Sequence, residues 1–472
     1  MDNQRDYVLR TVGERRVRLV RLWFTDVLGH IKSVAISPVE LDLALEEGVQ
    51  FDGSAIDGFS RVQESDVLAI PDPNSFQVVP SLNDEDATAR IFCDISNLDG
   101  TPFRGDPRQV LKRNLKAANA EGFDFMAAPE IEFFYLKNDD SSVPPVPLDN
   151  ASYFDLTADD ECSDIRRRTI HRLEATGIPV EYSFHEDAPS QHEIDLRYDD
   201  ALSAADNIMA LRMVVREVAK ASGVHATFMP KPIEGVQGSG MHTHFSLWKG
   251  EVNAFHDPED EYGLSLTARQ FMAGLLRHAG EITAVTNQLV NSYKRLVAGY
   301  EAPVHISWAR NNRSALVRVP VPKRGKEPES TRIEYRALDP ATNPYLSFSL
   351  ILAAGLRGIR EGYELPPETT DNLFGGAGSP TLTGLSGGGV GGPTGPGQDL
   401  PRRSGRKDFD AGAATLPTNL SSALDAMEGS ELVLDALGEH IFEWFLRNKR
   451  DEWSEYRTHV SSFELNRYLK LW

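Results

Sequence analysis

The spacing of apolar residues over the first hundred positions predicts a small unit rich in β-structure. The segment RVRLVRLWFTDVLG is typical of a strand that ends in a turn at Gly29, and HIKSVAI is typical of a second strand, so the two predict a hairpin. Residues 38–47 predict a short helix that ends at Gly48, and residues 89–95 predict a buried strand. We therefore expect a first domain at residues 1–100.

Helical and strand-like patterns alternate through residues 101–472, which predicts a second, larger domain. DFMAAPEIEFFYL predicts a pair of strands broken at Pro129. Apolar residues recur at helical spacing in several longer segments. These predicted helices span residues 106–121, 201–222, 264–285, 343–362 and 421–446. The Gly-, Pro- and Ser-rich run that begins at residue 375 cannot bury a core, so we expect a flexible loop at 375–410.

Composition and charge narrow the classes of protein. The chain has 40% hydrophobic and 25% charged residues, as ordinary soluble globular proteins do. Its net charge of −21 disfavours nucleic acid and anionic membranes as partners. Simple solubility or an acidic site for cations would each explain that charge. Two cysteines exclude a disulfide framework, and neither a signal peptide nor a membrane-spanning run is recognisable, so we expect a cytoplasmic protein.

Four glutamates occur in two short motifs. In PEIEFF, Glu130 and Glu132 lie two residues apart, so on a strand both point to one face. Like charges in an apolar strand are costly unless a cation separates them, although a solvent-facing edge strand would also tolerate them. In FHEDAPSQHEID, Glu186 and Glu193 each follow a histidine on either side of a Pro-containing loop. Taken alone, each of these two would be a solvated loop residue.

Two further motifs add imidazole and guanidinium groups. His242 and His244 in GSGMHTHFSL share one strand face, which makes them candidate metal ligands as well as candidate structural histidines. In STRIEYRALDP, Arg332, Glu334 and Arg336 share one face, as they also would in a surface ladder of salt bridges.

Together these motifs indicate a site for Mg²⁺ or Mn²⁺, because hard carboxylate ligands with one imidazole suit those ions better than structural zinc. Arg295, Arg313 and Arg318 add groups that bind carboxylates and phosphates. Divalent cations beside arginines that bind phosphate are typical of phosphoryl transfer. The residues alone lead no further than that class of chemistry.

The sequence resembles the class I glutamine synthetases from about residue 15 to the C-terminus. The matching strings are FDGSAIDGF, PEIEFF, HEDAPSQHEIDLRY, TFMPKPIEGVQGSGMHTHFSL, NSYKRLVAGYEAP, NRSALVRVP and RIEYRALDPATNPYL. The resemblance implies an α+β fold, with an N-terminal β-grasp domain and a catalytic domain built on a curved antiparallel sheet flanked by helices. It also implies a homododecamer of two rings, with each active site between neighbouring subunits.

The resemblance implies roles for the motif residues. Glu132, Glu186 and Glu193 match the ligands of a first metal, and Glu130, His242 and Glu334 match those of a second. The residues that match the glutamate binders are Arg295 and Arg336, with Gly238 and Gln237 beside them. The arginines that match those on the phosphate side are Arg313, Arg318 and Arg332. His244 and Ser246 match nucleotide contacts. Asp52, Tyr153 and Glu301 match the ammonium pocket, in which Asp52 comes from the adjacent chain and acts as the base while Glu301 acts as a flap.

The reaction implied is an ATP-dependent ligation. The γ-carboxylate of glutamate attacks the γ-phosphate of ATP, and ammonia or a small amine then attacks the resulting γ-glutamyl phosphate. Glutamine synthesis for nitrogen assimilation, γ-glutamyl–amine ligation of a polyamine or ethanolamine in amine catabolism, and an inactive assembly or regulatory paralogue are the three alternatives. The presence of all six metal-ligand matches argues against the third.

The sequence departs from the family pattern at three positions, and two of these bear on that choice. Ala55 replaces a usual serine in the ammonium pocket, and Gln237 replaces the usual asparagine beside glutamate. Both changes are similar to those in amine ligases, and both are also compatible with drift in a true glutamine synthetase. Phe374 stands where some members carry an adenylylated tyrosine, so we expect no adenylylation there.

Overall fold

The N-terminal part of the chain folds into one six-stranded sheet. We describe a computed structural model over residues 2–54, 56, 58, 66–79, 87–156, 161–370 and 414–471. The sheet has the order β2-β1-β6-β4-β3, with β5 paired to β6, and β1 and β6 are parallel while the other pairs are antiparallel. Its strands are β1 (Leu19–Thr25), β2 (Ile31–Ile36), β3 (Val49–Asp52), β4 (Asp66–Pro71), β5 (Gln77–Val79) and β6 (Thr88–Ser96). The predicted hairpin is β1–β2, with Gly29 at positive φ in its turn.

Two helices accompany this sheet. The predicted short helix is a 3₁₀ turn (Pro38–Glu40) followed by α2 (Leu41–Glu47), and it ends at Gly48 as expected. The N-terminal helix α1 (Asp2–Glu14) was not predicted from its polar sequence. Its Val8 and Val12 are buried in the core of this unit, so tertiary packing stabilises a segment with few apolar residues.

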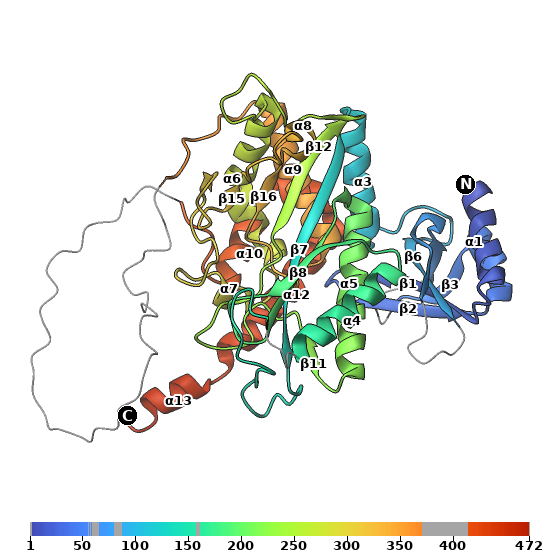
Figure 1. The fold of residues 1–472 in the computed structure, drawn as a ribbon, viewed down its shortest axis with the longest axis horizontal. Helices are drawn as coiled ribbons and strands as arrows, with labels where there is room; N and C mark the ends of the chain where they lie inside the picture. The colour runs from blue at the N-terminus through green and yellow to red at the C-terminus, as the bar shows by residue number, and fades with distance from the viewer. Residues whose placement is uncertain are drawn as a thin grey trace, which may run out of the picture.

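The larger part of the chain is built on a ten-stranded sheet. The main order is β14-β15-β16-β12-β7-β9-β8, and among the described strands of this sheet only the pair β14–β15 is parallel. The strands are β7 (Asp124–Leu136), β8 (Val180–His185), β9 (Gln191–Leu196), β10 (Asp199–Asp200), β11 (His225–Thr227), β12 (Thr243–Lys249), β13 (Val252–Asn253), β14 (Trp308–Ala309), β15 (Val317–Arg318) and β16 (Ile333–Tyr335). The long strand β7 lies at the centre, between β12 and β9 (Figure 1).

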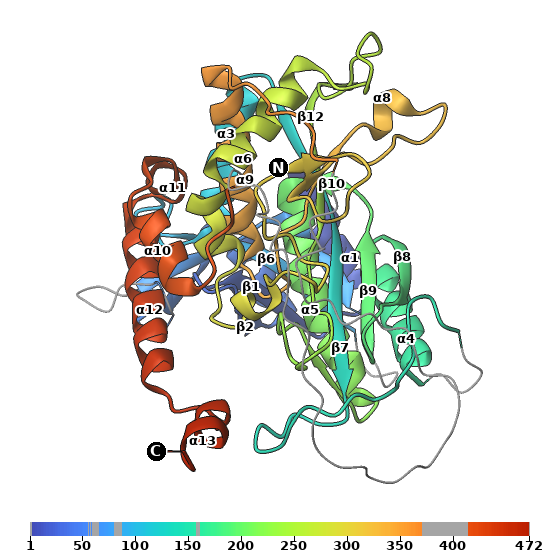
Figure 2. The ribbon, with the colours of Figure 1, turned by 90° about the vertical axis from the view of Figure 1, so that its left-hand side faces the viewer.

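Helices pack around this sheet (Figure 2). They are α3 (Pro107–Ala120), α4 (Glu161–Ala175), α5 (Ala201–Ala221), α6 (Leu266–Thr286), α7 (Ser292–Arg295), α8 (Glu327–Ser330), α9 (Pro344–Glu361), α10 (Leu420–Glu428), α11 (Glu431–Leu437), α12 (Glu439–Thr458) and α13 (Ser462–Tyr468). The helices α6 and α9 pack closely because Gly274 and Gly358 have no side chains: a Cβ at either would clash with backbone oxygen of the other helix. Both views show α13 projecting from the body of the molecule. No helix within the described ranges has the length and apolar character needed to cross a lipid bilayer.

Two predicted elements were wrong in their extent. Pro129 does not break a strand pair, because β7 runs through it. The Glu130 N–H donates to His242 on the β12 side, so the nitrogen of residue 129 faces the other side. On that other side, β9 pairs with β7 from Glu130 onward, and β10 pairs with β7 only as far as Ala127. Pro129 therefore lies between two partner strands, where its missing N–H costs no hydrogen bond. The single helix expected at 421–446 is three helices, because Gly429 ends α10 and Gly438 has a left-handed φ of 80°.

Some predictions fall outside the described residues. These are the flexible loop at 375–410, Ala55 and Phe374.

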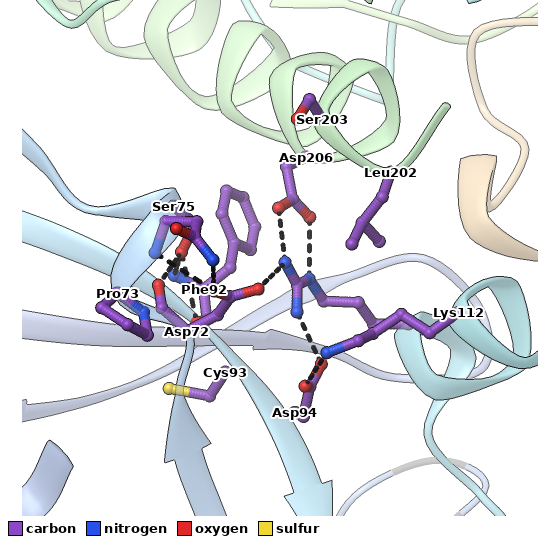
Figure 3. Close-up of polar contacts among 12 residues, drawn as sticks. Asp72, Pro73, Ser75, Phe92, Cys93, Asp94, Lys112, Leu202, Ser203 and Asp206 are labelled. Carbon is purple, nitrogen blue, oxygen red and sulfur yellow. Dashed lines mark hydrogen bonds and ion pairs between the residues drawn. The ribbon is translucent and has the colours of Figure 1, made fainter. Parts of the chain in front are cut away.

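A buried ionic cluster joins the two parts of the chain. Arg108 of α3 forms ion pairs with Asp72 at 2.9 Å, Asp94 at 2.5 Å and Asp206 at 2.9 Å. Figure 3 shows Asp72 and Asp94 from the N-terminal unit facing Asp206 from α5 across this cluster. Burial would raise the pKa of Asp72, but the charge and hydrogen bond of Arg108 outweigh burial and hold that pKa below its usual value. The cluster therefore fixes the N-terminal sheet against the larger domain.

Candidate active site

The central strand β7 brings the carboxylate motifs together. Glu132 is the register partner of Glu193 on β9, and the Glu130 N–H bonds to the His242 carbonyl just before β12. On the far side of β12, Glu334 of β16 lies opposite His244. Three neighbouring strand pairs thus place residues more than 200 positions apart on one face of the sheet.

One cavity of about 550 Å³ lies over this face. All six predicted metal ligands line it: Glu130, Glu132, Glu186, Glu193, His242 and Glu334. Tyr153, Gln237, Gly238, Arg295, Glu301, Arg313, Arg318 and Arg336 line it as well. The structure therefore brings fourteen of the eighteen predicted site residues to a single space.

One group of ligands is arranged around His242. Its Nδ1 lies 3.7 Å from Glu130, 3.9 Å from Glu132 and 3.9 Å from Glu334. Ligand atoms of Glu130, His242 and Glu334 all lie within 4.8 Å of one another, which is close enough for one cation to reach all three.

Cationic neighbours hold this group ionised. Glu334 is 1% exposed and accepts from Arg318 at 2.6 Å and from Arg336. Burial would raise the pKa of Glu334, but the arginine and histidine charges lower it to about 2. Burial likewise opposes ionisation of Glu130, yet His244, whose Nε2 lies 2.6 Å away, helps to hold the Glu130 pKa well below its ordinary value.

In the second group, Glu186 and Glu193 have no such compensation, whereas Glu132 lies 3.9 Å from His242. Burial and the charge of Glu132 raise the pKa of Glu186 to about 8. Burial and the neighbouring carboxylates also raise the pKa of Glu193 well above its ordinary value. Carboxylates gathered without a counter-charge fit a bound divalent cation, which would lower each of these pKa values. On this observation, the residues present fit the metals that the sequence indicates.

Glycines allow the backbone to approach these ligands. Gly240 donates its N–H to Glu132 at 2.9 Å, and a Cβ there would meet His242 and Glu132. A Cβ at Gly238 would collide with the Pro230 carbonyl. Beneath this turn, buried Arg295 donates to three backbone carbonyls of residues 336–338. The turn and the arginine are therefore held in one fixed arrangement.

A strained loop borders the opposite side of the cavity. Glu301 has a φ of 56°, which is unusual for a residue with a side chain, and it lines the cavity beside Tyr300. The ammonium group of Lys231 lies 3.9 Å from the centre of the Tyr300 ring. Lys231 also donates to the Val236 carbonyl, so it connects this loop to the glycine turn.

Comparison with known proteins identifies the family. The glutamine synthetase catalytic domain matches residues 104–383 and 397–468, and the glutamine synthetase β-grasp domain matches residues 16–98. The chain belongs to the glutamine synthetase family. This finding also confirms the predicted fold class, with one parallel strand pair in the otherwise antiparallel catalytic sheet.

Relatives in this family match the chain over its whole length. A glutamine synthetase of Mycolicibacterium smegmatis is 52% identical, and one of Mycobacterium tuberculosis is 53% identical, each over 100% of both chains. One of Methanosarcina mazei is 45% identical over 98% of this chain and 97% of its own. Among solved structures, glutamine synthetase of Plasmodium falciparum matches with a TM-score of 0.84 at 25% identity over 98% of both chains. A GmaS complex with ADP matches with a TM-score of 0.82 at 29% identity, covering 98% of this chain and 99% of that chain.

Four residues that the glutamine synthetase resemblance selects lie outside the cavity. His244 lies behind Glu130, and the Ser246 hydroxyl accepts from Trp248 at 3.0 Å. Arg332 donates to the Ser330 carbonyl at 3.0 Å. Asp52 is the last residue of β3, and its carboxylate accepts a hydrogen bond from the Ser54 N–H at 2.8 Å. The resemblance assigns Asp52 to a neighbouring subunit's site, so its role stays a prediction.

Sequence reasoning missed several residues of the cavity. Gln191 donates from one amide nitrogen to Glu132 at 2.9 Å and to the Gly238 carbonyl at 3.2 Å, which orients the ligand. Asp195 lies opposite Glu130 with one buried oxygen unpartnered, and burial raises its pKa to about 8. Its position two residues after Glu193 was a usable signal. The aromatic wall of Phe154, Tyr182 and Phe184 gave none, because loop and hairpin geometry creates it.

Proposed function

We propose that this protein joins the γ-carboxylate of glutamate to ammonia at the expense of ATP, through γ-glutamyl phosphate. The observation that carries the proposal is the convergence of all six metal-capable side chains on one cavity that also holds four arginines. Full-length relatives that carry the name glutamine synthetase, at 43–53% identity, favour ammonia over other amines.

Two or three divalent cations, Mg²⁺ or Mn²⁺, are assigned to the carboxylate groups. Glu132, Glu186 and Glu193 would hold the first, and the second would be held by Glu130, His242 and Glu334. When bound, the cations supply positive charge that offsets the charge of the transferring phosphoryl group. Gln191 keeps the Glu132 carboxylate in position for this.

The arginines and the glycine turn are assigned to the anionic substrates. Arg295 and Arg336 would bind the carboxylates of glutamate, with backbone groups near Gly238 and the Gln237 amide beside them. Arg313, Arg318 and Arg332 would stabilise the phosphoryl group, because guanidinium donors match its oxygens. His244 and Ser246 would contact the nucleotide.

The acidic side of the cavity is assigned to ammonium. Asp52 of an adjacent subunit would take a proton from ammonium, and Tyr153 and Glu301 would border the pocket. Closure of the loop that carries Glu301 would exclude water, which otherwise hydrolyses the acyl phosphate. This assignment requires neighbouring subunits, in keeping with the homododecamer that the resemblance implies. A cytoplasmic location is part of the proposal. Cys93 and Cys162 are both buried and neither forms a disulfide, as is usual in a reducing compartment.

A specific observation keeps γ-glutamyl–amine ligation as a second candidate. The amide of Gln237, which departs from the family pattern, donates to Asp187 at 2.6 Å and so forms a hydrogen bond at the cavity wall. The test is glutamate- and ATP-dependent phosphate release with ammonium, putrescine, spermidine and ethanolamine in parallel. We expect turnover with ammonium alone. Turnover with an organic amine at higher kcat/KM would make the second candidate correct.

Two matched variants test whether this activity depends on the cavity. Glu193→Gln removes a charge from the cation site and should abolish phosphate release. The control Glu174→Gln lies on the exposed face of α4 and should leave release unchanged. Absence of release with every amine in the wild-type protein, together with failure to bind Mn²⁺ and ATP, would instead indicate an inactive paralogue.

A further inference from the structure

A second cavity, of about 610 Å³, lies where the β1–β2 turn meets the larger domain. We call it the junction cavity. Its walls come from residues 28–31, one face of α5, residues 227–229, 288–289 and 340–341, and α12. Among the described residues it shares no lining residue with the catalytic cavity. It is therefore a separate space of the size that proteins use for small molecules.

Arg212 of α5 lines this cavity without an ion-pair partner among the described residues. Its side chain is 7% exposed, and no carboxylate oxygen of the described chain lies within ion-pair distance. One Nη donates to the Thr342 carbonyl at 2.7 Å, the other contacts the Met209 sulfur at 3.6 Å, and Nε has no partner. Burial and the nearby charge of Arg216 lower the pKa of Arg212 to about 9, and the charge of Asp339 offsets this lowering only in part. A buried guanidinium without an anion is costly, so the site is electrostatically incomplete.

A second arginine lies one helical turn further along the same face. Arg216 is exposed, and its guanidinium lies 5.6 Å from the centre of the Phe228 ring. Within the described ranges it has no acidic partner either. Two like charges four residues apart on a helix repel each other. An anion placed between them would remove that repulsion.

The carboxylate of the cavity wall does not supply this anion. Glu452 already accepts from Lys449 at 2.8 Å and from the Val290 N–H at 3.2 Å. The pair of Glu452 and Lys449 is therefore neutral as a unit. Within the described ranges, the two arginines remain without a carboxylate in ion-pair contact.

The rest of the lining is mainly apolar and adaptable. Met209, Met213 and Met229 line the cavity beside Phe228 and Leu289. Methionine side chains adapt their shape to an apolar ligand. Two cationic groups on an otherwise apolar wall suit a ligand with an anionic head and an apolar body.

We propose that the junction cavity binds a small organic anion, with its carboxylate or phosphate head at Arg212 and Arg216 and its apolar body among the methionines. This site is independent of the proposed ligase chemistry. Because the cavity wall includes both the β1–β2 turn and α5, a bound ligand would stabilise the contact between the two domains.

Calorimetric titration of the full-length protein tests the proposal. The probes are 4-phenylbutyrate and phenyl phosphate, which distinguish a carboxylate head group from a phosphate head group. The neutral control is 4-phenylbutyramide. Saturating ADP and Mn²⁺ are present so that the catalytic cavity is already occupied. We expect saturable binding of at least one anion and about tenfold weaker binding of the amide. Arg216→Gln should weaken anion binding about tenfold, whereas the exposed control Arg447→Gln should not change it.

A second variant supplies the missing anion from within the chain. Met213→Glu places a carboxylate between the arginines, so it should melt about 2 °C or more above Met213→Gln and should no longer bind the probes. Each of three results would overturn the proposal. They are no saturable binding up to about 5 mM probe, equal binding by Arg216→Gln, and binding that appears only after the residues beyond Thr458 are removed. The last result would mean that the C-terminal segment of another copy fills the cavity.

Discussion

Replacing Glu186 by glutamine should stabilise the metal-free protein. In the folded chain, burial and the charge of Glu132 raise the Glu186 pKa to about 8, well above its value in the unfolded chain. A carboxyl group with a raised pKa costs folding free energy above its unfolded pKa, and the cost grows until the pH passes the folded pKa. The metal-free protein should therefore lose stability as the pH rises from about 4.5 to about 8.

The size of this effect follows from the two pKa values. Because each pH unit between them is worth about 1.4 kcal/mol, the cost is roughly 2 kcal/mol at pH 6 and roughly 4 kcal/mol at pH 7.5. Urea unfolding in EDTA at these two pH values should show the wild-type protein losing about 2 kcal/mol relative to Glu186→Gln. Added Mn²⁺ should stabilise the wild type strongly and the variant little, and it should release protons when it binds to the wild type.

Glu174→Gln on the exposed face of α4 is the control, and its stability should follow the wild type at both pH values. Parallel pH profiles for the wild type and Glu186→Gln in EDTA would refute this reasoning. They would mean that the cluster is not short of positive charge when it holds no metal.

Three further predictions concern the joint between the domains, helix packing and the loop at Tyr300. Arg108→Met leaves three carboxylates without their main partner and should cost about 3–5 kcal/mol in unfolding free energy, whereas Lys112→Met at the margin of the cluster should cost about 1 kcal/mol or less. In calorimetry, Gly274→Ala should lower the melting temperature because its Cβ clashes with α9, and Gly280→Ala, which has open space, should leave it unchanged or raise it. Without ammonium, phosphate release should increase more in Lys231→Met than in Lys231→Arg, because only arginine keeps a cation over the Tyr300 ring. Equal release by the two variants would exclude a role for this cation in holding the loop.

Most of the fold could be predicted because its longer elements have clear periodicity and clear ends. Helices α5, α6 and α9 begin and end within about two residues of their predicted bounds, since caps such as Gly362 mark them. Local signals failed where tertiary structure decided the outcome. Pro129 is tolerated only because its nitrogen faces a gap between two strands, and that gap is not visible in the sequence.

The candidate site divides in the same way. Its candidate metal ligands could be selected because pairs two residues apart on a strand are visible in the sequence, and the same rule would have found Asp195. Gln191 has no such signal, because its role depends on reaching across to Glu132 from the next strand. The junction cavity could not be predicted either, since its walls come from segments far apart in the chain.

The hydrogen-bonded strands beneath the cavity tolerate fewer sequence changes than the irregular segments around it. The carboxylates assigned to the cations lie on or beside strands that are hydrogen-bonded to one another, so moving one of them shifts its neighbours in register. The residues assigned to the nitrogen donor, such as Tyr153 and Glu301, lie on irregular segments that can change length and sequence without disturbing those strands. A lineage built on this scaffold could thus acquire a new acceptor for the activated acyl group while its phosphoryl-transfer machinery stayed intact.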